Sequence, residues 1–168
     1  MSQPTTPLRT FFRLGFHSAF FHRTHVHNLR ITPVQLLWLL LITTAASILM
    51  GRLVVPGRAE FFPKALLWGW MITLLMLWLC WYLSDHARER GLKTQAAALF
   101  AIGTTQALVL DVLSTVLYMG VIQPLGLESS SWHWALYIAM TSWAALAFWL
   151  LLTRSTQVPV KLILLAGL

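Results

Sequence analysis

One acidic side chain, Asp111, lies in the middle of a long apolar run, and its type and place indicate a function more clearly than any other residue. An ionised carboxylate at the centre of a bilayer costs about 2.5 kcal/mol or more, so it needs compensation there. Helical spacing places other polar side chains on or near the same face, with Thr105 and Gln106 half a turn away. The residues that share the face of Asp111 are Thr104, Ser114, Thr115 and Tyr118. The sequence therefore predicts a polar stripe that faces protein rather than lipid.

Hydroxyl side chains on two other apolar runs are the predicted partners of Asp111. They are Thr43, Thr44 and Ser47 in one run, and Tyr137, Thr141 and Ser142 in another. No Lys or Arg occurs at matching depth, so we expect Asp111 to be protonated or to serve a cation of a partner subunit. Three interpretations stay open: a carboxyl that joins helices by hydrogen bonds, a docking point for a partner membrane protein, and a proton or ion relay.

Three closely spaced histidines, His22, His25 and His27, precede the first long apolar run, with His17 upstream. Clustered imidazoles can bind zinc or copper, and they titrate near neutral pH. No Asp, Glu or Cys lies nearby to complete a ligand set, so we predict no metal site and no cofactor. The sequence also contains no Ser-His-acid set and no metal-binding helix motif. These observations favour a protein that is not an enzyme.

The elements that must position these residues follow from composition. Of 168 residues, 58% are hydrophobic and 10% are charged, whereas soluble domains carry roughly 25% charged residues. This excludes a soluble globular domain and predicts an all-α, polytopic transmembrane helical bundle over 33–168. The four expected spans are about 33–51, 63–84, 94–121 and 131–153.

Two parts of this predicted bundle leave alternatives open. The third span is longer than a bilayer requires, so it is either one tilted helix or a helix broken near Gly103. The segment 158–168 is apolar but too short to cross a bilayer. It is either half-embedded at the interface or the front of a fifth span that has been cut. The deep residues Trp78 and Trp143 are expected to pack between helices or to face lipid.

The distribution of charge predicts the orientation. Twelve Lys and Arg against five Asp and Glu give a net charge of +7. With four spans both termini share one side, and nine of the twelve cations fall on it, which predicts a cytoplasmic N-terminus. These nine are Arg9, Arg13, Arg23, Arg30, Arg88, Arg90, Lys93, Arg154 and Lys161. Topology thus accounts for most of the charge, and we expect a multi-pass protein of the bacterial inner membrane with no nucleic-acid partner.

Residues 1–32 form a basic and aromatic segment ahead of the first span. On a helical wheel, one broad face carries Leu8, Phe11, Phe12, Phe16 and Ala19, and the opposite face carries Arg9, Arg13 and His17. We favour an interfacial helix on the cytoplasmic leaflet, with Phe12 and Phe16 at the acyl chains and Arg9 and Arg13 among anionic headgroups. The alternative is a flexible basic leader that only enforces topology.

Three features of the chain occur together: the basic, aromatic N-terminal stretch, the motif Leu-Arg-Ile-Thr-Pro-Val-Gln-Leu-Leu at 29–37, and closely spaced hydrophobic helices. This layout resembles bacterial members of the Yip1-like membrane family. It is also similar to the membrane-embedded front portion attached to soluble enzymes in some proteobacterial proteins. Yip1-like proteins have five spans, and here the fifth would correspond to the short piece 160–168. The resemblance implies a role in binding partners or organising membranes.

We therefore expect a non-catalytic membrane anchor, scaffold or accessory subunit. Its expected partners are the bilayer with its anionic headgroups and other membrane protein subunits, or further copies of the same chain. The alternative is a small oligomeric transporter or proton-coupled channel that uses Asp111.

Overall fold

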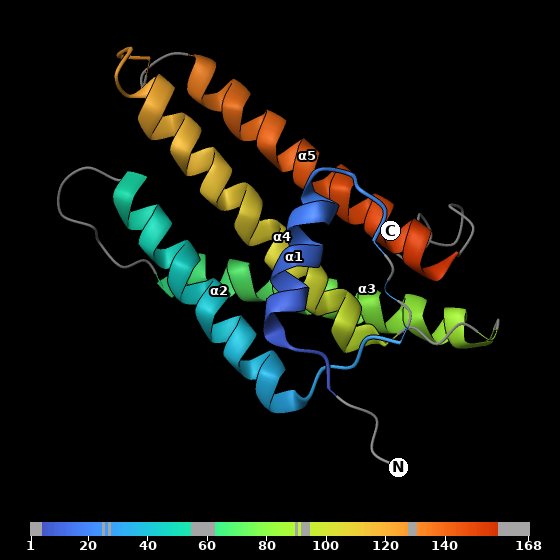
Figure 1. The fold of residues 1–168 in the computed structure, drawn as a ribbon. Helices are drawn as coiled ribbons and strands as arrows, with labels where there is room; N and C mark the ends of the chain where they lie inside the picture. The colour runs from blue at the N-terminus through green and yellow to red at the C-terminus, as the bar shows by residue number, and fades with distance from the viewer. Residues whose placement is uncertain are drawn as a thin grey trace.

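In the described part of the chain, all regular secondary structure is helical (Figure 1). The computed structural model describes residues 5–24, 26, 28–54, 63–89, 91, 95–127 and 131–157, with the backbone alone at 63–69 and 133. The elements are α1 (Leu8–Ala19), α2 (Pro33–Val54), α3 (Pro63–Glu89), α4 (Ala96–Leu117), the π-helical turn η1 (Tyr118–Ile122) and α5 (Ser131–Thr156). The all-α prediction is confirmed for these residues.

Three of the described helical segments are long and apolar enough to cross a membrane. They are Pro33–Val54, Ala96–Ile122 and Trp134–Thr156, which correspond to the first, third and fourth expected spans. The second expected span lies in α3, and a count of four spans stays a prediction. The segment 158–168 lies outside the described residues.

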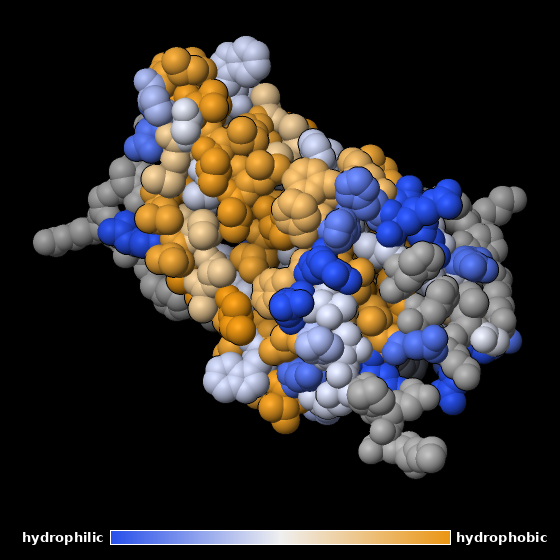
Figure 2. Space-filling model, viewed as in Figure 1, coloured by the Kyte–Doolittle hydropathy of each residue, from blue (hydrophilic) through white to orange (hydrophobic). Residues whose placement is uncertain are grey.

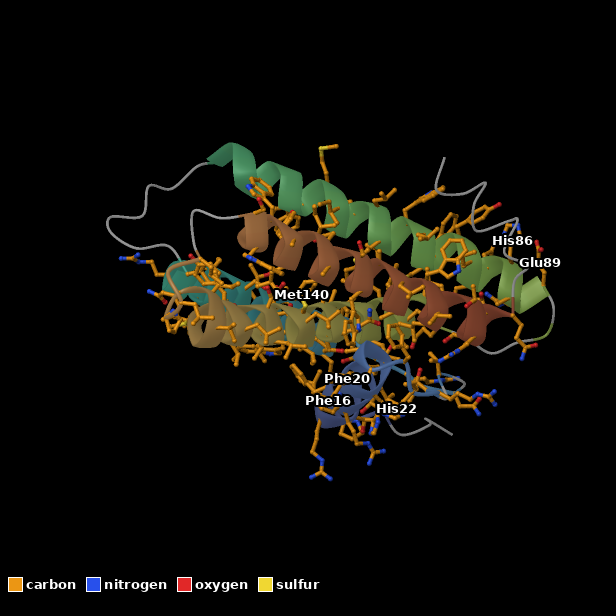
Figure 3. The ribbon with its side chains drawn as sticks, turned by 90° about the horizontal axis from the view of Figure 1, so that it is seen from above. Phe16, Phe20, His22, His86, Glu89 and Met140 are labelled. Atoms are coloured by element: carbon orange, nitrogen blue, oxygen red, sulfur yellow. The ribbon has the colours of Figure 1, made fainter. Side chains whose placement is uncertain are left out.

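Helix α4 is the centre of the bundle, and each of the other four α-helices packs against it. Successive long helices run in opposite directions, so α2 begins at the end of the molecule where α3 ends, α4 begins and α5 ends (Figure 1). Seen from above, α1 and α3 lie on opposite sides of α4 and α5 (Figure 3). The short N-terminal helix therefore covers one side of the bundle.

The start of α2 is encoded locally by Thr32 and Gln35. The backbone N–H of Gln35 donates to the Thr32 hydroxyl at 3.2 Å, and the backbone N–H of Thr32 donates to Gln35 Oε1 at 3.0 Å. This reciprocal pair satisfies two backbone donors at the helix start. Thr32 is therefore the cap of α2, and Pro33 occupies the first helical position, where its missing N–H costs nothing.

Helix α4 continues through Gly103 without a break, so of the two alternatives for the third span the unbroken helix is correct. A Cβ at Gly103 would lie 2.7 Å from a ring carbon of Phe148 and 3.0 Å from the terminal methyl of Met76. The glycine therefore permits close approach of α5 and α3 instead of breaking the helix. With η1, the segment Ala96–Ile122 has 27 residues, about 40 Å at a rise of 1.5 Å per residue, against a hydrocarbon thickness of about 30 Å.

The core lies around the first half of α4. Its consecutive residues 98–103 are buried, together with Phe11 of α1, Leu39 of α2, Leu83 of α3 and Leu152 of α5. Toward the other end of the molecule, α2 and α5 expose large apolar side chains (Figure 2). Hydrophilic residues gather instead over α1 and the end where α4 begins (Figure 2). The two halves of α4 therefore have different surroundings.

Candidate functional site

The polar side chains of α4 divide into two groups that face different neighbours. Thr105 and Gln106 are buried against α1, whereas Ser114, Thr115 and Tyr118 line a hollow with residues of α2 and α5. Thr104, which the helical wheel places with the second group, is half-buried and donates to the carbonyl oxygen of Ala101 in its own helix. The predicted polar residues thus form two sites, one in each half of α4.

The carboxylate of Asp111 is bound by a hydroxyl group of α2. Ser47 Oγ donates to Asp111 Oδ2 at 2.8 Å, so one of the three expected hydroxyl partners on α2 makes the contact. Thr43, one turn earlier, instead donates to the carbonyl oxygen of Leu40 in its own helix. Asp111 and Ser47 are both exposed. The bond joins α2 to α4 at the surface of the bundle.

Beside this bond is a partly open hollow of about 150 Å³ between three helices. We call it the α2–α4–α5 hollow, and its lining residues are Val54, Ser114, Thr115, Tyr118, Leu136 and Tyr137. Asp111 precedes Ser114 and Thr115 by three and four residues, a spacing that places neighbours on one helix face. The carboxylate therefore lies one helical turn below the hollow, toward the middle of α4.

The π-helical turn η1 starts at Tyr118, which is also in the wall of the hollow. The backbone N–H of Gln123 donates to the carbonyl oxygen of Tyr118 at 2.9 Å, across five residues. Single π-helical turns are rare, and where they occur within helices they are frequent at functional sites. The sequence shows no signal for this turn.

The second site joins α1 to α4 and α5 through buried polar contacts, and we call it the α1 junction. The Ser18 hydroxyl donates to Gln106 Oε1 at 2.8 Å, and Gln106 Nε2 donates to the carbonyl oxygen of Ala144 at 3.3 Å. The Thr105 hydroxyl lies 3.1 Å from the carbonyl oxygen of Phe11. One glutamine therefore links three helices, and its buried amide has a partner for both its oxygen and its nitrogen.

Close backbone approach makes the α1 junction possible. A Cβ at Gly15 of α1 would overlap the Thr105 side chain and would lie 2.9 Å from the backbone nitrogen of Gln106. Only a residue without a side chain fits against α4 at this position. Gly15 therefore permits the close packing of α1 against α4.

Two side chains of α5 hold the C-terminal turn of α1. Trp143 Nε1 donates to the carbonyl oxygen of Ala19 at 2.7 Å, and Arg154 Nη1 donates to that of Phe21 at 2.7 Å. Phe21 has a φ of 61°, which is uncommon for a bulky residue. Its ring stacks on Trp143 with centroids 5.5 Å apart and an interplanar angle of 14°. These contacts compensate for the unfavourable backbone conformation at Phe21.

The four residues predicted at the lipid interface are all at least partly exposed on α1. Arg9, Arg13 and Phe16 are exposed, and Phe12 is half-buried. Phe11, from the same apolar face, is instead buried in the core. The segment is thus a folded helix packed on the bundle, which excludes the flexible leader for Leu8–Ala19.

The histidine cluster is described only in part, because His25 and His27 lie outside the described residues. His22 is exposed, and its ring centroid is 5.6 Å from that of His17. Figure 3 shows His22 beside Phe16 and Phe20 at the end of α1, far from His86 and Glu89 at the end of α3. Within the described residues no group of three or more His, Cys, Asp or Glu side chains could hold a metal ion.

No protein-family model, curated protein or solved structure matches the chain. The similarity of its layout to Yip1-like proteins therefore stays a prediction.

The two sites have different chemical capacities. At the α1 junction, donors and acceptors of the chain bind one another, so this site can fix the positions of helices. The α2–α4–α5 hollow offers hydroxyl and phenol groups near an open surface, and the Asp111 carboxylate lies one helical turn away. Together they can bind a group from outside the chain. Of the residues that line the hollow, sequence reasoning singled out Ser114, Thr115, Tyr118 and Tyr137 but missed Val54 and Leu136. It also missed Ser18, Trp143 and Arg154 as contacts of the junction.

Proposed function

We propose that the chain is a non-catalytic integral protein of the bacterial inner membrane that acts as an anchor, scaffold or accessory subunit for another membrane protein. The observation that carries the proposal is the exposed carboxylate of Asp111 within Ala96–Ile122, a segment apolar enough to span. An ionisable group in such a segment is costly when it faces lipid and is normally covered by protein or water. A partner helix over Asp111 and Ser47 would provide that cover.

The proposed topology has four spans, with α3 as the second and the N-terminus in the cytoplasm. The alternating helix directions agree with it, because they bring the segments next to Arg30, Arg88 and Arg154 to one end and Arg52 to the other. This distribution follows the preference of Lys and Arg for the cytoplasmic side. Arg9 and Arg13 of α1 are exposed and available to anionic headgroups.

Photo-crosslinking in intact membranes tests the partner. A benzophenone amino acid replaces Tyr137, which lines the hollow and is 60% exposed. The matched control replaces Ile72, which is 62% exposed on α3. We expect a discrete crosslinked protein from position 137 that position 72 does not give, identified by mass spectrometry. Equal crosslinking at both positions, or none at either, contradicts the proposal.

The alternative function is a small oligomeric transporter or proton-coupled channel, which the hydroxyl groups of the hollow beside Asp111 favour. Its test is proton flux into vesicles that contain the purified chain and a pH-sensitive dye. Flux that is present in the unmodified chain and lost in the Asp111→Asn variant would support the alternative and contradict the scaffold. We expect no flux above that of empty vesicles.

A further inference from the structure

We propose that the α2–α4–α5 hollow and Asp111 together bind a cationic side chain, Lys or Arg, of a transmembrane helix in the partner protein. The inference rests on the proposed function and specifies its partner chemically. It would explain why a carboxylate, an open hollow and a π-helical turn occur together on one face of α4.

The carboxylate of Asp111 has acceptor capacity beyond the bond from Ser47. That bond is made to Oδ2 at 2.8 Å, and an ionised carboxylate has about four lone-pair positions. A neutral hydroxyl donor does not balance a negative charge in an apolar environment, whereas an ammonium or guanidinium group does. The exposure of Asp111 leaves room for such a group to approach.

At the level of Asp111 and Ser47 the sequence offers no cation, and the first one farther along α2 is Arg52, five residues beyond Ser47. Residues 33–51, 65–84 and 94–153 contain no Lys or Arg, and these ranges include almost all of the expected spans. Charged groups within membranes commonly pair with one another. A cation that pairs with Asp111 at its depth must therefore come from another molecule.

The hollow has the size and lining that a side chain requires. Its volume of about 150 Å³ is below the roughly 300–1,000 Å³ of typical small-molecule sites. Ser114, Thr115 and the phenol groups of Tyr118 and Tyr137 offer oxygen acceptors, and the two tyrosine rings can also contact a cation through their faces. Val54 and Leu136 offer apolar contact to the aliphatic part of a Lys or Arg side chain.

The surroundings of the hollow suit a helix as the carrier of the cation. Ile48 of α2, Val116 of α4 and Ile138 of α5 are 61%, 60% and 61% exposed. These apolar side chains can pack along a partner helix while one basic residue reaches the hollow. A basic residue on a transmembrane helix is itself costly in lipid. Pairing it with Asp111 would therefore offset the cost of both charges.

The test uses the purified chain in phosphatidylcholine and phosphatidylglycerol vesicles with a synthetic transmembrane peptide. The peptide is a run of leucines with one central Lys, and its control has Leu at that position. Energy transfer from a donor at the N-terminus of the chain to an acceptor on the peptide reports association. We expect the Lys peptide to bind about tenfold more tightly than the Leu peptide, the size of one intramembrane polar contact.

Two variants assign the effect to the site. In the Asp111→Asn variant we expect the preference for Lys to disappear. The Asp85→Asn variant removes an acidic residue that is exposed near the end of α3, and we expect it to keep the preference. Equal binding of the two peptides by the unmodified chain overturns the inference without any variant, and so does a preference that persists after Asp111→Asn.

Other sources of a cation give distinct results. If phosphatidylethanolamine in the vesicles abolishes the Lys preference, the hollow binds a lipid ammonium group, and the inference is overturned. Self-association of the chain that Asp111→Asn abolishes would identify a second copy as the occupant and would also overturn it. If the peptides bind equally while position 137 still crosslinks a partner, the scaffold stands and only the cationic contact is wrong.

Discussion

A polar side chain is buried in one half of α4, and another is exposed in the other half. At the α1 junction, Gln106 is 2% exposed and bridges Ser18 and Ala144. At the α2–α4–α5 hollow, Asp111 is exposed and bonded to an exposed Ser47. A buried polar group with all its partners inside the chain fixes the arrangement of helices. An exposed one in an apolar segment indicates contact with something outside the chain.

The largest expected effect is a loss of stability at the α1 junction. In the Gly15→Ala variant the added methyl group collides with Thr105 and the backbone of Gln106, so we expect a loss of about 3 kcal/mol in stability. Thermal unfolding in mild detergent measures it. The control is Gly51→Ala, where a Cβ meets nothing within 4 Å, and there we expect no loss. Similar loss in both variants would mean that α1 does not pack closely on α4.

The Gln106→Leu variant replaces the amide that links the three helices of the junction with an apolar side chain of similar size. It leaves the Ser18 hydroxyl buried without its acceptor, and we expect a loss of about 2 kcal/mol. Chemical unfolding in detergent, compared with Gln123→Leu at an exposed position, measures the difference. A loss at Gln123 as large as that at Gln106 would show that the amide bonds of the junction are not the cause.

The Trp143→Phe variant keeps an aromatic ring against Phe21 but removes the donor to Ala19. We expect a loss of about 1 kcal/mol, confined to the end of α1. Hydrogen exchange of residues 17–24 should become faster, with little change in α4. The control Trp70→Phe, at a residue 60% exposed on α3, should leave that exchange unchanged. Uniform acceleration along the chain would contradict a local role for Trp143.

The smallest effect on stability is expected at the hollow. The Asp111→Asn variant retains an oxygen that accepts from Ser47, so the free energy of unfolding should change by less than about 0.5 kcal/mol. Unfolding in detergent under the conditions used for Gln106→Leu provides the comparison. A loss as large as at Gln106 would make the hollow a second packing centre, and the contrast between the two halves of α4 would disappear.

Local signals in the sequence predicted the helices well. Long apolar runs located three segments that can span a membrane, and Thr32 with Gln35 encodes the start of α2 within four residues. Both signals act over a few residues, so they depend little on the rest of the fold. The expected pairing of Asp111 with a hydroxyl of α2 also holds, because few polar groups occur at that depth.

The neighbours of each helix face could not be predicted in the same way. A helical wheel gives the angle between Thr104 and Gln106, but it does not show that α1 covers Gln106. The contacts at the junction join residues 38 to 133 positions apart, and no local pattern indicates such pairs. The amphipathic pattern of α1 predicted an apolar face correctly, yet Phe11 of that face packs on protein.

Because α1 and its contacts on α5 are far apart in the sequence, α1 is synthesised well before those contacts. Trp143 is 124 residues beyond Ala19, so at 5–20 residues per second the ribosome makes it about 6–25 s later. During that interval the binding surface of α1 on α5 does not yet exist. The membrane surface is the apolar environment open to a basic amphipathic helix during that time. The contacts between α1 and α5 are thus a late step of assembly, because they form only after α5 has been synthesised.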